Sequence, residues 1–434
     1  MRLSGQLKGS ARAGARPACF SFTGCCPGNR AAHAVSLWVV VAAGLITAGC
    51  RPVAAPVPPS SPEYSQLPLE EVRRRANSGT DARALRELAY RTLQQGDAEG
   101  ALRQSDLALT LDANSSDAHN IRGMAYAQLS RPGDAAREFQ IAVKCAPKRL
   151  GPRLNLGRLF LTAGQYAVAA QVFQEALRVD PKSEKAARLA GDAWRLAGSS
   201  LTAQKYYRKA LDLHPDNPQT LARLGEVLVN RGRCDEAREI LARARELGDK
   251  EARTRSYLGL AWAITAAGPE EAATALEHLE GARAAGEQGS HVYYGLGLAY
   301  LTRGDLKQSA QVLNEGLQRY PDVPGLHYTL ADVLARTGRA AESQKSRERS
   351  AELTVLHARE ERFVDALSEH PNEIRRYLDY ADWLFGRGEG ARALPVLQQA
   401  LRIRPKDPEI SRRLTRAQKQ ATRPVTSSPG RKAG

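Results

Sequence analysis

Small and apolar residues recur along the chain with a period of 34 residues. Within each period, two stretches place apolar side chains at helical spacing, and a glycine separates the two stretches. This pattern predicts pairs of helices stacked in succession over residues 82–407. Equivalent residues one period apart form a ladder, and each such position is called a rung. The glycine rungs are Gly123, Gly157, Gly191, Gly225 and Gly259, followed by Gly297 after an insertion. The prolines that close periods are Pro147, Pro181 and Pro215.

Physical chemistry explains which residue type occupies each rung. Glycine and alanine suit the points where two helices cross closely, because a larger side chain would not fit. The turns near Gly164, Gly198 and Gly232 favour glycine because they end a helix in the left-handed conformation. Proline ends the second helix and suits the start of the next pair, where a missing N–H costs little.

The pattern resembles the tetratricopeptide repeat, in which small, aromatic, alanine and proline residues recur at fixed positions. The resemblance covers about three quarters of the chain and implies an all-α fold. Specifically, it implies an α-solenoid, a right-handed superhelix of antiparallel helix pairs with about nine units.

The predicted domain boundaries follow from this register. The expected parts are a signal peptide or membrane anchor over 1–49, a Pro-rich linker over 50–80, repeats one to eight over 81–357, an inserted helix over 358–373, repeat nine over 374–407, a capping helix over 408–421 and a disordered basic tail over 422–434. Two irregularities stand out. The turn of the sixth repeat is expected to hold four extra residues, and residues 351–367 are expected to lengthen the second helix of the eighth repeat.

The N-terminal region contains an uncharged, mostly apolar stretch from Ala34 to Gly49 that ends at Cys50. Its length favours a signal peptide over a membrane span, which needs about 20 residues. The residues before Cys50 resemble the lipobox of bacterial lipoproteins, although Thr47 stands where leucine is most frequent. The resemblance implies lipid attachment at Cys50, and Arg51 after it favours the outer membrane with the repeats facing the periplasm. An uncleaved anchor over the same stretch is the alternative.

The formal net charge of +16 resembles that of a nucleic-acid-binding protein until its distribution is considered. Residues 81–411 hold 47 basic and 44 acidic side chains, so the excess lies in the two flanks. We therefore expect no nucleic-acid partner. The cysteine and histidine spacings match no metal site, and no catalytic or nucleotide-binding motif is present, which predicts no cofactor, no metal, no small-molecule substrate and no enzymatic activity.

In the family that the repeats resemble, first helices line a concave groove that binds partners. Here this implies a set of groove residues: Asn120, Met124, Arg158, Lys185, Arg188, Asp192, Arg195 and Glu226. Their arginine and lysine side chains could hold an acidic peptide, or they could form an ordinary solvated face.

Three functions remain open from the sequence. The first is a lipid-anchored scaffold of the bacterial envelope that binds other proteins, in assembly of a secretion, pilus or polysaccharide-export complex. The second is a cell-wall or exopolysaccharide accessory protein that binds an acidic polymer. The third is a cytosolic scaffold.

Overall fold

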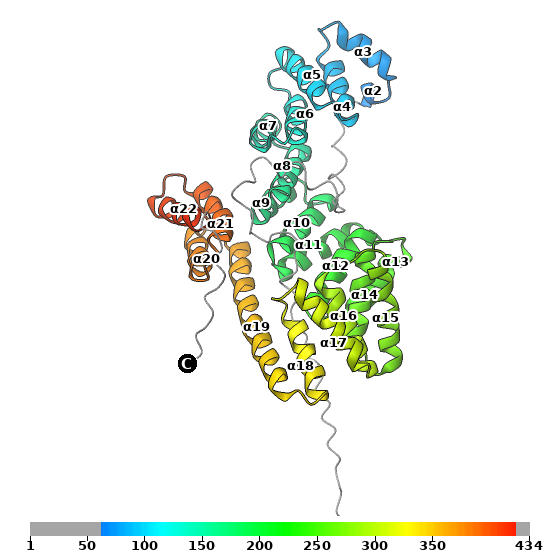
Figure 1. Cartoon of the computed structure of the whole chain (residues 1–434). Helices are drawn as coiled ribbons and strands as arrows, with labels where there is room; N and C mark the ends of the chain where they lie inside the picture. Colours follow the sequence, from blue (N-terminus) through cyan, green and yellow to red (C-terminus); the bar gives the residue numbers. More distant parts are fainter. Residues whose placement is uncertain (1–61, 422–434) are drawn as a thin grey trace, which may run out of the picture. The chain divides into compact units, whose positions relative to one another are not determined.

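The computed structural model describes residues 62–421, and all regular structure in that range is helical. The described helices follow one another as packed pairs, as an all-α solenoid requires (Figure 1). Two compact units divide the described chain. Unit 1 comprises residues 228–245 and 250–355, and unit 2 comprises residues 62–227, 246–249 and 356–421.

Unit 2 contains the first four repeats and the C-terminal helices. Its helices are α2 (Pro62–Ser65), α3 (Leu69–Asn77), α4 (Ala82–Gln94), α5 (Ala98–Leu111), α6 (Ser116–Gln128), α7 (Pro132–Cys145), α8 (Leu150–Thr162), α9 (Tyr166–Val179), α10 (Glu184–Ala197), α11 (Ser200–Leu213), α20 (Ile374–Gly386), α21 (Gly390–Ile403) and α22 (Pro408–Ala421). The pairs α4–α5, α6–α7, α8–α9 and α10–α11 are repeats 1 to 4, and α20–α21 is repeat 9.

Unit 1 contains the middle repeats. Its helices are α13 (Cys234–Glu246), α14 (Ala252–Thr265), α15 (Pro269–Ala284), α16 (Ser290–Arg303), α17 (Leu306–Arg319) and α18 (Pro324–Arg336). Two further helices, α12 (Pro218–Asn230) and α19 (Ala340–Glu369), continue across the boundaries between the two units, and the last residue of α13, Glu246, belongs to unit 2. The pairs α14–α15 and α16–α17 are repeats 6 and 7.

The glycine ladder marks a close contact inside each repeat. A Cβ atom at Gly157 would lie 2.5 Å from a ring carbon of Phe173, which is nearer than two carbon atoms can pack. Glycine therefore lets the ring of the second helix lie directly on the first helix. The same contact joins Gly123 to Phe139, Gly191 to Tyr207, Gly259 to Leu279 and Gly297 to Leu313. Gly225, on α12, is buried.

Glycines with positive φ end the first helix of most repeats. Gly164, Gly198 and Gly232 have φ values of 70°, 96° and 74°. In repeat 2 the equivalent position is Ser130, with φ 58°, which is the one non-glycine residue with positive φ in the described chain. A left-handed residue at this point stops the helix and turns the chain toward the second helix.

The three ladder prolines lie between repeats. Pro147 is the second residue of a turn in which the Arg149 N–H donates to the Ala146 carbonyl at 3.0 Å. Equivalent turns enclose Pro181 and Pro215. The fixed φ of proline suits this turn position, so these residues shape the connection between repeats.

The prediction that the linker continues to residue 80 is wrong for residues 62–77, which form two helices. Helices α2 and α3 lie within that range, and α3 buries Val72 and Ala76 against α4 and α5. The Tyr64 hydroxyl also donates to Asp81 at 2.7 Å, and the Asp81 side chain accepts the Arg83 and Ala84 N–H groups that begin α4. These helices cover the face of repeat 1 that has no preceding repeat.

The two predicted irregularities differ in detail from the structure. No separate helix occupies 358–373, because the insertion lengthens α19 to 30 residues, whereas α17 has 14. The extra residues of the sixth repeat do not all lie in its turn. That turn spans only 266–268, and α15 takes up part of the insertion by extending to 16 residues. The α22 helix spans the range of the expected capping helix.

Candidate functional site

The candidate groove residues lie on first helices of repeats 2 to 5, all within unit 2. Asn120 and Met124 are on α6, Arg158 is on α8, Glu226 is on α12, and the remaining residues are on α10. Their surroundings divide them into residues that hold the repeats together and residues that remain accessible to a ligand.

Asn120 and Met124 both have structural contacts. Asn120 is 6% exposed and accepts a hydrogen bond from the amide of Asn155 on α8, at 2.9 Å. This buried pair links repeats 2 and 3. Met124 packs against the cluster of buried residues that repeats 1 and 2 share. Both side chains therefore contribute to packing between neighbouring repeats.

Arg195 and Glu226 form a buried ion pair between repeats 4 and 5. The Arg195 Nη1 atom lies 3.1 Å from Glu226 Oε1, and the Glu226 side chain is 4% exposed. Burial alone would lower the pKa of Arg195, but the charges of Glu226, Tyr207 and Asp192 raise that pKa well above its usual range. Separating such a pair would leave a buried charge, so it serves repeat packing rather than ligand capture.

Asp192 joins the groove to the same packing network. Its Oδ1 atom accepts a hydrogen bond from the buried Tyr207 hydroxyl at 2.8 Å. Its Oδ2 atom lies 3.5 Å from Nη1 of Arg188. Burial, followed by the charge of Asp192, raises the pKa of Tyr207 well above its usual value, so this hydroxyl stays a donor.

Arg158, Lys185 and Arg188 form a cation cluster on α8 and α10. All three side chains are half-buried. Burial and then the charge of Arg188 lower the pKa of Arg158. Burial, followed by the charges of Arg158 and Arg188, lowers the pKa of Lys185. Three positive charges are thus held close enough to disfavour one another's ionisation.

Within the cation cluster, Arg188 lies beside two carboxylates. Glu184 lies 3.6 Å from Arg188 Nε, and Asp192 is the other acid beside that guanidinium. Both distances exceed those of a good charge-assisted hydrogen bond. Lys185 donates no hydrogen bond within residues 62–421. An added carboxylate could therefore approach Lys185 and gain a direct bond.

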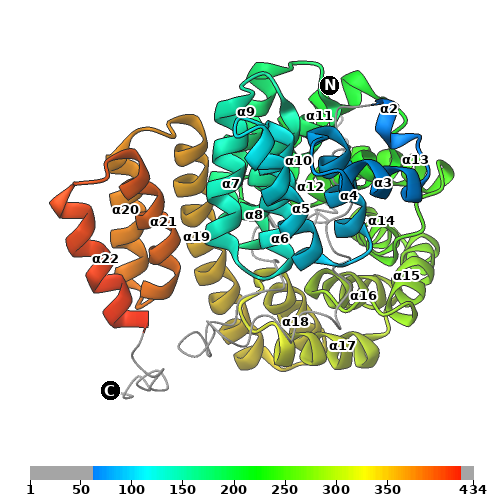
Figure 2. The same cartoon turned by 90° about the horizontal axis from the view of Figure 1, so that it is seen from above.

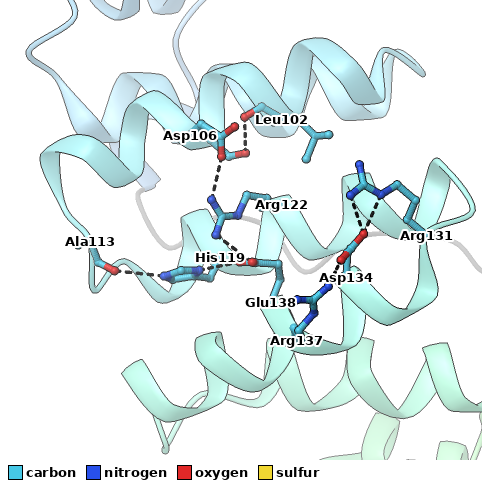
Figure 3. A network of polar contacts seen from close by, with 10 residues as sticks. Leu102, Asp106, Ala113, His119, Arg122, Arg131, Asp134, Arg137 and Glu138 are labelled. Carbon is cyan, nitrogen blue, oxygen red and sulfur yellow. Dashed lines mark hydrogen bonds and ion pairs between the residues drawn. The ribbon is translucent and has the colours of Figure 1, made fainter.

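A polar network in repeats 1 and 2 was missed by the sequence reasoning (Figure 3). His119 on α6 lies with Nδ1 2.7 Å from the Glu138 carboxylate and Nε2 3.1 Å from the Ala113 carbonyl oxygen. Arg122, one turn further along α6, donates to Glu138 and to Asp106, at 2.8 Å each. Arg122 and the two carboxylates of Asp106 and Glu138 therefore tie α5, α6 and α7 together, and these residues serve packing.

Within residues 62–421, no group of three His, Cys, Asp or Glu side chains is arranged to hold a metal ion. No helix in that part of the chain is both long and apolar enough to cross a bilayer. The segment 1–49, Cys50 with the first part of the linker (residues 51–61), and the tail 422–434 lie outside the described residues.

Sequence comparison identifies the repeats. Family models described as tetratricopeptide repeat match residues 86–149, 154–218, 195–256, 260–324 and 294–345, which together make up more than half of the chain. Among curated proteins, no sequence matches this chain significantly.

Several solved structures resemble the chain. One is pilF of Pseudomonas aeruginosa, at 20% identity and TM-score 0.43, which covers 49% of this chain and 93% of its own. Another is MamA of Desulfovibrio magneticus RS-1, at 25% identity and TM-score 0.35, covering 38% and 94%. A third is YrrB, described as a TPR protein with an unusual peptide-binding site, at 19% identity and TM-score 0.36, covering 43% and 97%. Because these TM-scores are below 0.5, the family of the chain is inferred from the repeat matches and not from these structures.

Proposed function

Because the chain belongs to the tetratricopeptide repeat family, whose members generally mediate protein–protein interaction, we propose that it is a non-enzymatic scaffold that binds an acidic segment of a partner protein. The cation cluster of Arg158, Lys185 and Arg188 is the binding site in this proposal. The scaffold is attached to the bacterial envelope through Cys50, with the outer membrane favoured and the repeats in the periplasm. There it assists assembly of an envelope complex.

The mutual proximity of the three cations carries the binding proposal. Placing Lys185 beside two arginines costs free energy, since burial and both neighbouring charges lower its pKa. Such arrangements are concentrated at functional sites, because a bound ligand of opposite charge removes the repulsion. An acidic side chain would lie between α8 and α10 and accept bonds from both helices.

Binding is tested with a fluorescently labelled peptide of about ten glutamates and the full chain, by anisotropy. The Lys185→Gln variant is expected to bind about tenfold more weakly, because one charge-assisted hydrogen bond is lost. The matched control is Lys205→Gln, which removes the same charge from an exposed position on α11. Equal affinities for both variants would overturn the proposed site. If alginate displaces the peptide completely and binds more tightly, the acidic polymer replaces the acidic protein segment as the ligand.

The envelope location has its own test. Cells that express the wild type or the Cys50→Ala variant are labelled with palmitate and fractionated. We expect labelled wild type in the membrane fraction and unlabelled, soluble Cys50→Ala protein. The absence of label from both proteins would overturn lipid attachment, and soluble unlabelled wild type would support the cytosolic scaffold.

A further inference from the structure

The C-terminal module, defined as residues 356–421 of unit 2, has a hydrophobic core of its own. Tyr377 and Leu384 from α20, Leu397 from α21 and Ile410 from α22 are each at most 1% exposed and pack in one cluster. Figure 2 shows α20, α21 and α22 side by side. Apart from Ala197 of repeat 4, every residue of this cluster belongs to the module itself.

The same module nevertheless contacts repeat 3, more than 200 residues earlier in the chain. Gln399 donates to the Gln171 side-chain oxygen at 2.7 Å, and the Gln171 amide donates to the Tyr377 hydroxyl at 3.3 Å. Arg402 donates to the Gln165 side chain at 3.0 Å. The Arg402 guanidinium also lies over the Phe160 ring, 4.7 Å from its centre.

Repeat 4 contributes a second set of contacts. The Thr202 and Ser368 hydroxyls are 3.0 Å apart, and the Ser199 hydroxyl donates to Asp365. Ala197, at the end of α10, packs against the module's apolar cluster. The module therefore contacts two consecutive repeats at once.

The interface between the module and repeats 3 and 4 is mainly polar. Its contacts are hydrogen bonds between polar or charged side chains, one cation–π contact and one alanine. The Gln399 side chain is 7% exposed, and its own oxygen has no hydrogen-bond partner among the described residues. Polar interfaces of this kind are typical of segments that dock reversibly within one chain.

Repeats 3 and 4 are also the repeats that carry the cation cluster. Arg158 belongs to repeat 3, whereas Lys185 and Arg188 belong to repeat 4. Repulsion between Lys185 and the two arginines opposes a close approach of the two repeats. The module, which bonds to both repeats, counteracts this repulsion, and an acidic ligand counteracts it as well.

We propose that the C-terminal module is a clasp that fixes the spacing of the cation cluster, with Gln171, Gln399 and Arg402 as positioning residues for the acidic ligand. Docking of the module and binding of the ligand favour each other, and by thermodynamic linkage each strengthens the other by the same factor. This inference rests on the proposed binding of an acidic segment.

Two variants of the full chain test the clasp in opposite directions. The double variant Gln399→Ala/Arg402→Ala removes contacts with Gln171, Gln165 and Phe160, and we expect it to bind the glutamate peptide about fivefold more weakly. The Gln165→Glu variant gives Arg402 a charged acceptor, and we expect tighter peptide binding. The control is Arg404→Ala, because Arg404 lies near Arg402, is exposed and has no side-chain partner within the described residues. We expect its affinity to be unchanged.

Hydrogen exchange provides the readout that separates positioning from general destabilisation. In the double variant, amides of α9 and α11 should exchange faster, while those of α20 and α21 keep their protection because the module's core is intact. Peptide added to the wild type should slow exchange in α9 and α11. Failure of the wild type to bind peptide overturns both proposals. Peptide affinities that are equal in all clasp variants overturn the clasp alone.

Discussion

At the residue scale, the position after each first helix shows how strongly one backbone angle constrains the sequence. Glycine occupies this position in repeats 1, 3, 4 and 5, as Gly96, Gly164, Gly198 and Gly232, each with positive φ. Repeat 2 has Ser130 in the same conformation. A side chain in the left-handed region costs about 1–2 kcal/mol, so repeat 2 bears a local strain that its neighbours avoid.

The Ser130→Gly variant is expected to raise the free energy of unfolding by about 1 kcal/mol. Removing the Cβ relieves the strain, and the greater freedom of glycine in the unfolded chain offsets part of the gain. Chemical denaturation measures the change. The contrasting variant is Ser346→Gly inside α19, where glycine should cost about 0.5 kcal/mol. A destabilised Ser130→Gly protein would contradict the argument.

His278 on α15 is expected to make stability depend on pH. Burial, followed by the charge of Arg255, lowers its pKa below the usual 6.5, and its Nδ1 atom has no hydrogen-bond partner among the described residues. As the pH falls below 6.5, the unfolded chain takes up this proton first, so folded-state stability decreases until the folded-state pKa is reached. The His278→Gln variant should lose less stability between pH 7.5 and pH 5.5 than the wild type. An unchanged difference in denaturation midpoint between the two pH values would contradict this.

The groove residues show what a repeat pattern can and cannot establish. The period identifies the face on which Asn120, Arg158 and Arg195 lie, because equivalent positions in successive repeats point the same way. It does not show that Asn120 bonds to Asn155, or that Arg195 is buried against Glu226. Those pairings depend on side-chain reach between neighbouring repeats. Whether any groove residue binds a partner stays a prediction.

At the scale of elements, helix type and order follow from the sequence wherever the ladder is regular. The sequence did not identify α3, because its nine residues contain five charged side chains and it precedes the first repeat. Its one fully buried side chain, Val72, becomes recognisable only once the uncovered face of repeat 1 is known. The contact between α21 and α9 was equally hidden, since no local pattern relates residues more than 200 positions apart.

If α3 covers repeat 1, shortening Val72 should loosen that repeat. The Val72→Ala variant removes two buried methyl groups and is expected to cost about 2 kcal/mol. Hydrogen exchange in α4 should become faster, because α3 packs directly on it. Arg73→Ala, at an exposed position of the same helix, is the control and should leave α4 unaffected. Unchanged exchange in the Val72→Ala protein would show that α3 is not needed to cover the repeat.

At the scale of the whole molecule, a repeat array distributes its stability through contacts between neighbours rather than through one central core. Phe173 in repeat 3 and Leu279 in repeat 6 occupy the same rung, each fully buried against a glycine of its own repeat. The two residues belong to different units. A cavity made at one of them should therefore affect its own repeat and the adjacent ones first.

The Phe173→Ala variant is expected to lose about 3–5 kcal/mol of local stability, with faster hydrogen exchange in α8, α9 and α10. Helices α16 and α17 belong to the other unit and should keep their wild-type protection, because nearest-neighbour coupling weakens with each intervening repeat. The Leu279→Ala variant should give the reciprocal result, with exchange faster in α14, α15 and α16 and unchanged in α8. If either substitution accelerates exchange equally in all of these helices, the described chain unfolds as one cooperative body. Nearest-neighbour stability would then be wrong for this solenoid.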